Sequence, residues 1–335
     1  FLNLFQLLDL HYTEKPLDEK VHDTYMAMLV FNTLLRAIVM VRNRREFTQL
    51  LEFVKTLYAE LMMEYDFEIR RIMQQHTDLV LKISKIILTM GILTSTGFSI
   101  FPIMSDKREF IFGIYVPYLN EYQRPWYEIL LTSQCILNLS GLCMFIPFTG
   151  MFVSFLIFAI AISKILQRKL NNFPQEISSR QLIQEKIVES VQLHLKLISL
   201  VDKVNERTLI ISMIDVILFV VLLCIMLLSF ILVKTVIQKC IITVYILMIF
   251  TQTFVLYYFS NELYYQSLEI STAVYDINWF NYDVETQNML RLLLLRSQKP
   301  CAVLISKAYP INLKTLQVLL KVTYSVFTLL EQFYG

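Results

Sequence analysis

The fold is decided by one long uncharged stretch, residues 129–163, which reads ILLTSQCILNLSGLCMFIPFTGMFVSFLIFAIAIS. It contains no Asp, Glu, Lys or Arg in more than thirty residues. An α-helix rises about 1.5 Å per residue, so a helix of this length would extend about 50 Å. The apolar core of a bilayer is only about 30 Å thick. We therefore expect a helix that crosses a membrane and continues beyond it.

The rest of the chain has the same character. Of 335 residues, 56% are hydrophobic and 17% are charged, whereas a typical soluble domain has about a quarter charged residues. Further uncharged runs cover residues 86–105, 216–233 and 241–260. There are no ten-residue segments of alternating polarity separated by turn residues, which a transmembrane β-barrel requires. We predict an all-α, polytopic membrane protein, because a helix satisfies its own backbone hydrogen bonds in lipid.

The apolar runs predict seven transmembrane helices. The first residue is Phe1 and not Met, so residues 1–10 are interpreted as the tail of an incomplete first helix. The third span is expected to end at Pro102. The six further spans are expected at residues 22–41, 81–101, from after Pro125 to 170, 207–233, 241–265 and 312–333.

The distribution of basic residues predicts the orientation. Clusters of Lys and Arg follow the second span (Arg42, Arg44, Arg45) and the fourth (Lys164, Arg168, Lys169). Basic residues near spans concentrate on the cytoplasmic side. With both clusters inside, the N-terminus is cytoplasmic and the C-terminus is outside. Few of the 30 basic residues then fall on outer segments. Those are Lys15, Lys20, Lys107, Arg108, Arg124, Lys234 and Lys239.

Two segments next to these clusters are amphipathic. Residues 44–78 and 181–206 carry apolar side chains at helical spacing between charged ones, which is typical of a helix with one buried face. We expect cytoplasmic helical extensions that lead into the third and fifth spans and contact other subunits. The alternative is a pair of solvated helices on the lipid surface.

Signs of catalysis, cofactors and metal binding are lacking in the sequence. The four histidines form no His-Glu-x-x-His motif, and no GxSxG elbow is present. The net charge of +2 gives no reason to expect nucleic acid. The acids nearest the spans, Asp215 and Glu128, are expected at span edges within reach of solvent. Asn138 is expected to form a hydrogen bond between helices or to be a polar group in a pocket. We predict no enzyme activity, no cofactor and no metal.

Three blocks in the C-terminal third resemble the insect odorant receptor family. Residues 273–280 read AVYDINWF, residues 295–300 read LRSQKP, and residues 323–330 read TYSVFTLL, which is similar to the family pattern Ser/Thr-Tyr-Ser-x-Phe-Thr-Leu-Leu. The related gustatory receptors place Gln-Phe five residues after Thr-Tyr. Here seven residues separate these pairs, which favours the odorant branch.

The resemblance implies a subunit of a tetrameric, ligand-gated, non-selective cation channel in the plasma membrane of a sensory neuron. Insect olfactory co-receptor subunits, a small volatile odorant, membrane lipid and permeant cations would be its partners. Residues 1–270 would form the ligand-sensing bundle, 271–308 the cytoplasmic anchor region and 309–335 the pore-lining last helix. The residues expected at the subunit anchor are Tyr275, Trp279, Met289, Leu292, Leu293 and Arg296.

The last helix carries too many polar side chains to face lipid on every side. Thr323, Phe327, Leu330 and Glu331 lie at i, i+4, i+7 and i+8 and share one stripe. By analogy with the family, Phe327 and Leu330 would form a hydrophobic constriction, with Glu331 at the outer mouth. The alternative is that this stripe packs within the helical bundle.

An odorant site should be an apolar cavity with a few polar groups. In this family it lies among spans 2, 3, 4 and 6, in their outer halves. The expected ligand-binding residues are Tyr25, Met28, Phe31, Thr94, Gly97, Phe101, Tyr127, Leu131, Gln134, Tyr245, Met248 and Phe250. Alternative functions are a gustatory-type homomeric channel, a G-protein-coupled receptor, and a transporter or scaffold.

Overall fold

A computed structural model describes residues 2–12, 14–104, 108–117, 120–173, 180–306 and 309–334 of the chain. Nearly all of these residues are helical. The helices are α1 (Leu2–Tyr12), α2 (Leu17–Arg42), α3 (Arg44–Met62), α4 (Phe67–Met104), α5 (Trp126–Asn171), α6 (Arg180–Leu232), α7 (Val236–Tyr275), η1 (Trp279–Asn281), α8 (Val284–Ser297) and α9 (Leu313–Tyr334). A short antiparallel pair, β1 (Leu304–Ile305) and β2 (Tyr309–Pro310), joins α8 to α9.

The predicted helical membrane fold is confirmed. Within the described residues, six helices are long and apolar enough to cross a membrane, namely α2, α4, α5, α6, α7 and α9. The short α1, with 11 residues, stands where the first span was expected and packs on α2. Leu81, Ile92 and Leu93 of α4 and Ile217 of α6 are among many exposed apolar side chains, which suits helices that face lipid.

Several expected boundaries were wrong, and each has a local reason. The helix of the third span continues past Pro102 to Met104. A proline near the last turn interrupts few backbone hydrogen bonds, so the helix tolerates it. The amphipathic segment 44–78 is divided between α3 and the start of α4, and a turn after Met62 separates the two helices. The strand pair was also missed, because two-residue strands leave no periodic signal.

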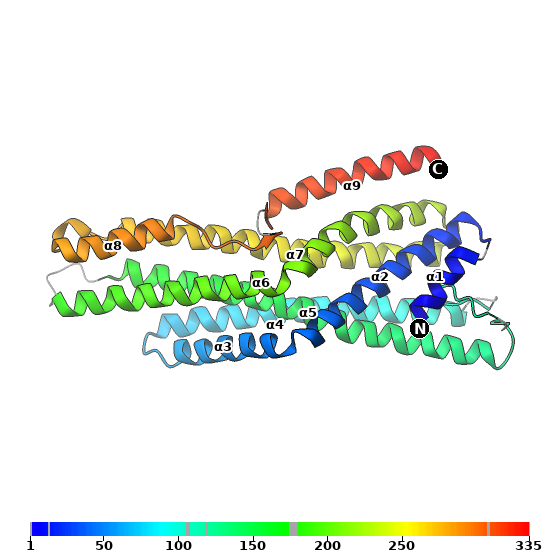
Figure 1. The fold of residues 1–335 in the computed structure, drawn as a ribbon, viewed down its shortest axis with the longest axis horizontal. Helices are drawn as coiled ribbons and strands as arrows, with labels where there is room; N and C mark the ends of the chain where they lie inside the picture. The colour runs from blue at the N-terminus through cyan, green and yellow to red at the C-terminus, as the bar shows by residue number, and fades with distance from the viewer. Residues whose placement is uncertain are drawn as a thin grey trace.

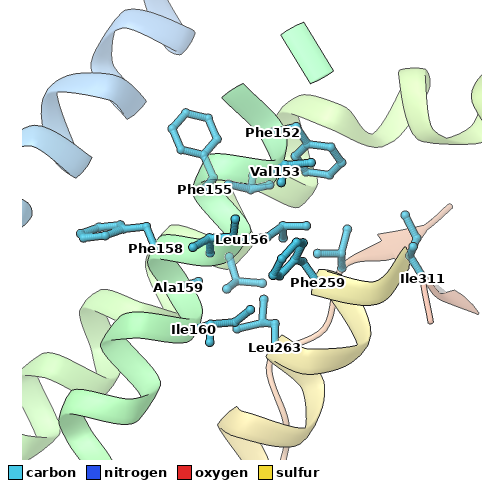
Figure 2. Close-up of a cluster of buried hydrophobic side chains, with 14 of the residues drawn as sticks. Phe152, Val153, Phe155, Leu156, Phe158, Ala159, Ile160, Phe259, Leu263 and Ile311 are labelled. Carbon is cyan, nitrogen blue, oxygen red and sulfur yellow. The ribbon is translucent and has the colours of Figure 1, made fainter. Parts of the chain in front are cut away.

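The helix α5 is the central axis of the bundle. It contacts α2, α4, α6 and α7, and its side chains from Phe152 to Leu170 supply much of the core. In Figure 2, Leu156 and Ile160 of α5 point toward Phe259 and Leu263 of α7. The second half of the uncharged stretch is therefore surrounded by protein, whereas in its first half Ile129, Ile136, Leu139 and Met144 are 50–64% exposed.

The bundle is elongated along the helix axes (Figure 1). Its two ends differ. The helices α3 and α8 lie at one end, and the turn between α1 and α2 and the C-terminal end of α9 lie toward the other (Figure 1). Ion pairs such as Arg168–Asp66, with 3.1 Å between Nε and Oδ2, gather near α3. The expected domain boundary at residue 270 falls inside α7, which continues to Tyr275.

The last helix α9 lies along the outside of the bundle (Figure 1). It packs mainly on α6 and less on α7. In its most apolar 18-residue window only 11% of the residues are buried, whereas the figure for α5 is 72%. A helix so little covered by its own chain leaves most of its surface to lipid, solvent or other subunits.

Candidate ligand-binding site

A cavity of about 180 Å³ lies among α2, α4, α5 and α7. These are the four spans expected to surround a ligand, and residues 111–112 before α5 complete the wall. The lining is mainly apolar. Its residues are Met26, Leu29, Val30, Thr33, Leu34, Ala37, Gly91, Thr94, Ser95, Phe98, Ile111, Phe112, Leu137, Asn138, Ser140, Gly141, Leu142, Met144, Phe145, Ile146, Tyr245 and Met248.

Two of the polar side chains in this lining, Thr94 and Asn138, are hydrogen-bonded within the protein. Thr94 Oγ1 donates to the carbonyl oxygen of Gly91 at 2.9 Å, in its own helix. Asn138 Nδ2 donates to the Ser95 carbonyl oxygen at 3.0 Å and lies 3.1 Å from Ser99 Oγ. The predicted hydrogen bond from Asn138 to another helix is therefore confirmed. An apolar ligand would meet a wall made mainly of methyl, thioether and aromatic groups.

A glycine lies in the cavity wall where α4 meets α5. A Cβ atom at Gly91 would collide with the side chains of Ile146 and Leu142. Glycine therefore allows close approach of the two helices at the cavity. Gly97 was predicted to leave space for the ligand, but a Cβ there would meet only Ile241 at an ordinary 3.7 Å. The tighter packing at the cavity is at Gly91, six residues earlier, where the ends of the Ile146 and Leu142 side chains would have to move.

Residues 111–113 cover one end of the cavity and are held by two side chains. Gln134 Oε1 accepts a hydrogen bond from the Ile111 amide at 2.8 Å, and Gln134 Nε2 donates to the Phe112 carbonyl oxygen at 2.7 Å. Asp23 Oδ1 accepts from the Gly113 amide at 2.7 Å. The predicted ligand contact at Gln134 is thus a positioning contact, since this side chain fixes the segment that touches the cavity.

The structure brings only part of the predicted ligand set to the cavity. Thr94, Tyr245 and Met248 line it. Tyr25 is fully buried elsewhere, Phe31 is 51% exposed, and Phe250 is 36% exposed. The other predicted residues outside the lining are Met28, Gly97, Phe101, Tyr127, Leu131 and Gln134.

On α2 the predicted ligand residues differ from the observed lining in helical phase, and on α5 they differ in depth along the helix. The lining residues of α2, such as Met26, Leu29, Val30 and Thr33, follow an i, i+3, i+4, i+7 pattern. The predicted stripe of Tyr25, Met28 and Phe31 lies one position away, which rotates it by about 100° around the helix. On α5 the lining begins at Leu137, beyond all three predicted residues.

A second, smaller cavity of about 80 Å³ adjoins the first. Leu29 and Phe145 line both cavities and separate them. Its walls come from α2, α5, α6 and α7, with Ile311 before α9. Its lining is Leu29, Asn32, Arg36, Phe145, Thr149, Ser212, Asp215, Val216, Leu218, Phe219, Leu222, Ile249, Gln252, Thr253, Leu256, Tyr257 and Ile311.

A partly buried ion pair lies in the wall of the second cavity. Arg36 Nη2 lies 2.8 and 2.9 Å from the two carboxylate oxygens of Asp215. Arg36 Nη1 donates to Thr149 Oγ1 at 2.9 Å, and the guanidinium stacks 4.1 Å from the centre of the Phe145 ring. Asp215 was expected near a span edge within reach of solvent; its side chain is 26% exposed, and Arg36 of α2 reaches it across the bundle. This pair ties α2, α5 and α6 together.

The stripe predicted to line a pore on α9 has a mixed environment. Thr323 is 4% exposed, and its carbonyl oxygen lies 3.4 Å from Cys224 Sγ of α6. Phe327 and Leu330 are half-buried, and Glu331 is exposed. The stripe therefore begins against α6 and becomes more open toward the C-terminus. Thr323 packs inside its own subunit.

The predicted anchor residues also divide between two environments. Leu293 is buried against its own chain, whereas Leu292 is 69% exposed. Met289 packs against the core, and Arg296 Nη1 donates to the Lys299 carbonyl oxygen at 3.1 Å. Exposed apolar residues cluster in this part of the sequence. They are Tyr275, Trp279, Phe280, Val284, Leu292 and Leu295.

Sequence reasoning missed the residues of the second cavity and the wall between the two cavities. Arg36 carried the only available signal, because an arginine inside an apolar span requires a partner. Asp215 could have been matched to it as an acid beside a span. Phe145 and Leu29 gave no signal, since an aromatic or leucine side chain in a span is ordinary. No group of three or more His, Cys, Asp and Glu side chains among the described residues could hold a metal ion.

Comparison with known proteins agrees with this architecture. A family model described as 7tm odorant receptor matches residues 17–324. Odorant receptor 30a of Drosophila melanogaster is 37% identical over 100% of this chain and 89% of its own length. Odorant receptor 10 of Aedes albopictus is 30% identical over 100% of this chain and 90% of its own length.

Solved structures show the same fold. The insect olfactory receptor OR5 of Machilis hrabei matches with a TM-score of 0.87 at 12% identity, over 98% of this chain and 85% of that one. The same receptor in complex with eugenol matches with a TM-score of 0.80 at 15% identity, over the same shares of each chain. The family model and the full-length relatives together show that the chain belongs to the insect odorant receptor family, whose members are multi-pass membrane receptors and not enzymes.

Proposed function

We propose that this chain is the odorant-binding subunit of a heteromeric, ligand-gated cation channel in the plasma membrane. The observation that carries the proposal is the mainly apolar cavity of about 180 Å³ among four spanning helices. Its size suits a small volatile molecule, since larger ligands need pockets of about 300 Å³ or more. The related receptor of similar fold was solved in complex with eugenol.

The proposed ligand contacts are those of the cavity wall. Thr94, Tyr245 and Met248 remain from the residues expected on sequence grounds, and Phe98, Phe145 and Ile146 join them. Methionine and aromatic side chains adapt to different shapes. A cavity with these walls would accept several odorants of similar volume rather than one.

The proposed conduction path runs beside α9. This helix carries Lys314, Gln317, Lys321 and Ser325 among its exposed or half-buried residues, which would be costly in contact with lipid. Around a shared axis, such a face would meet water or other subunits. We propose Phe327 and Leu330 as the constriction and Glu331 as the outer acidic group. The packing of Thr323 against α6 removes it from this set.

Assembly would use the apolar residues left open at the end that holds α8. Val284, Leu292 and Leu295 share one face of α8 at i, i+8 and i+11 and are 59–73% exposed. This end carries many ion pairs, such as Arg168–Asp66 and Lys196–Glu60, and so faces water. Exposed apolar clusters in water mark protein interfaces. We propose that co-receptor subunits cover this face.

The proposed orientation has the N-terminus inside and the C-terminus outside. Arg42 ends α2, Arg44 and Arg45 begin α3, and Lys164, Arg168 and Lys169 lie in the last turns of α5. Both clusters lie toward the end of the bundle that holds α3. Basic residues beside spans favour the cytoplasm. An epitope at the C-terminus should be readable on intact cells, and its absence there would contradict this orientation.

Gating would follow from a difference in affinity. A ligand that binds the open state better than the closed state by about 1–3 kcal/mol shifts the population toward the open state. Tyr245 and Met248 of α7 line the cavity, and α7 contacts α9. Movement of α7 around a bound odorant would therefore reach the helix of the proposed pore.

The test is whole-cell current during application of an odorant panel, in cells that express this chain with or without an insect olfactory co-receptor. A rapid cation current only with the co-receptor is the expected result. Current from this chain alone would instead favour a self-sufficient or gustatory-type channel. Silence in both, with surface delivery verified by the C-terminal epitope, would contradict the channel function.

A further inference from the structure

The second cavity is lined mainly by apolar side chains, but several polar side chains also reach it. Three side chains in its lining have a buried polar atom with no hydrogen-bond partner among the described residues. They are Asn32 with Oδ1, Arg36 with Nε and Gln252 with Nε2. Each of these residues is more than nine-tenths buried, at 6%, 7% and 6% exposure. An unpaired buried polar group is costly, so three around one cavity indicate a polar occupant.

The Arg36 guanidinium shows the incomplete bonding most clearly. It has five N–H donors. Nη2 is occupied by Asp215 and Nη1 by Thr149, and only Nε has no partner. The Asp215 carboxylate compensates the charge of Arg36. The cavity therefore has no need of a second anion, and a neutral group suffices.

The free atoms define the chemistry of that group. Arg36 Nε and Gln252 Nε2 donate, whereas Asn32 Oδ1 accepts. A hydroxyl group offers one O–H donor and two acceptor lone pairs, which matches this set. A carbonyl or ether oxygen lacks the donor and would leave Asn32 Oδ1 unpaired. The volume of about 80 Å³ holds a hydroxymethyl-sized group but not a whole odorant.

The position of the cavity connects it to the proposed odorant site. Leu29 and Phe145 separate the two cavities, and one of these two, Phe145, is a ring held by stacking on Arg36. A ligand in the apolar cavity that carries a hydroxyl group could displace this ring and place its oxygen beside Arg36. The apolar part of the ligand would then occupy the larger cavity and its hydroxyl group the smaller one.

We propose that the second cavity is a hydroxyl-binding subsite, so that the odorants of this receptor include alcohols or phenols whose apolar part fills the larger cavity. This inference rests on the proposed function, because it deepens the chemistry of the same ligand site. Asn32 and Gln252 would then determine specificity for the hydroxyl group, whereas the apolar residues of the larger cavity limit the size of the ligand.

The first experiment compares matched ligands. Dose–response curves are measured in cells that express the chain with an insect olfactory co-receptor, for alcohols and for methyl ethers of equal length. The wild type should respond to the alcohol at lower concentration. Gln252→Leu and Asn32→Leu should each raise the half-maximal concentration for the alcohol by about two- to ten-fold, the equivalent of one hydrogen bond, and leave the ether unchanged.

Ser229→Ala is the matched control. Ser229 is also fully buried in a span and its Oγ has no partner among the described residues, but it lines neither cavity. It should leave both curves unchanged. Equal shifts for alcohol and ether in Gln252→Leu and Asn32→Leu would overturn the subsite.

A binding measurement separates failure of the subsite from failure of the channel function. The thermal midpoint of the purified complex is measured with the alcohol and with the ether, without any current. The expected result is a larger rise with the alcohol, reduced in Gln252→Leu but retained in Ser229→Ala. Equal rises in the wild type would mean that the second cavity holds water only, and the proposal would be wrong. If the alcohol raises the midpoint more than the ether does but no current is seen, only the channel function is contradicted and the subsite stands.

Discussion

The helices α5 and α9 are both apolar enough to cross a membrane, yet the fold uses them in opposite ways. In their most apolar windows 72% of the α5 residues are buried and 11% of the α9 residues are. Four other spans surround α5, whereas α9 rests mainly on α6 and lies on the outside (Figure 1). Hydropathy measures compatibility with lipid or with a protein core, and it does not distinguish these two environments.

This difference in burial indicates which property of the protein each helix affects. The largely buried second half of α5 holds its own subunit together, so changes there should appear as lost stability. A helix that is open on most sides, with lysines and hydroxyl groups on its free surface, depends on what lies outside the subunit. Its changes should appear in assembly and conduction. Stability and function can therefore be separated by mutation.

The largest loss of stability is expected where the ion pair holds α2 and α6 to α5. Arg36→Leu leaves the Asp215 carboxylate half-buried and without its partner, and breaking such a pair typically costs about 3–5 kcal/mol. The thermal midpoint of the solubilised protein should fall sharply. The double variant Arg36→Leu/Asp215→Leu should recover much of the loss, since no unpaired charge remains.

Arg124→Leu is the control for this change. Arg124 pairs with Glu128 at 2.8 Å, but the two side chains are 77% and 48% exposed. Surface pairs contribute about 0–1 kcal/mol, so the midpoint should hardly move. An equal fall for Arg124→Leu and Arg36→Leu would show that burial of the Arg36 pair has no structural importance.

Leu166→Ala on α5 should cost about 2–5 kcal/mol, because a buried leucine is replaced and a cavity remains. Leu166 is fully buried. Leu329→Ala on α9, where the leucine is 54% exposed, should leave the stability of the separate subunit almost unchanged. Size-exclusion chromatography of each variant, alone and with the co-receptor, shows whether the subunit stays folded and whether it still assembles. A Leu329→Ala subunit that unfolds by itself would contradict the contrast between the helices.

A smaller effect is expected from pH at the end of the bundle where α6 and α8 meet. Burial, with a minor contribution from the Arg296 charge, lowers the pKa of His194 from 6.5 to about 4. The unfolded chain binds this proton more readily, so stability is full above pH 6.5 and falls between pH 6.5 and 4. At pH 5 the loss is of the order of 1–2 kcal/mol.

The thermal midpoint measured from pH 8 to pH 5 tests this dependence. His194→Gln should flatten the profile, whereas His11→Gln, at an exposed position, should leave it as in the wild type. A profile that keeps its slope in His194→Gln would assign the dependence to another group.

The smallest effect on stability is expected from a substitution on α9, which should cost less than about 1 kcal/mol. Its main effect should be on function. Phe327 is half-buried, so Phe327→Ala removes little packing. If Phe327 forms the constriction, the variant should raise basal current or alter ion selectivity. Phe333→Ala, where the ring is 74% exposed on a different side of the helix, is the control. Unchanged gating and permeation in Phe327→Ala would contradict the pore assignment.

The sequence predicted the elements more closely than their surroundings. The span from Pro125 to 170 agrees with α5 (Trp126–Asn171) almost to the residue, because charge and proline mark both ends. The region of the cavity, among α2, α4, α5 and α7, also agrees. Individual wall residues agree less well, since a one-residue error of phase turns a side chain such as Phe31 from the cavity toward the outside.

By itself the sequence determined the membrane environment, the helical class and the family, because these follow from local composition and short blocks of residues along the chain. Only the tertiary structure decided which faces meet. Arg36 and Asp215 are 179 positions apart, and their pairing depends on how α2, α5 and α6 cross. The two cavities exist where packed side chains fail to fill the space between helices. Such gaps depend on the volumes and rotamers of many residues together, which no single stretch of sequence contains.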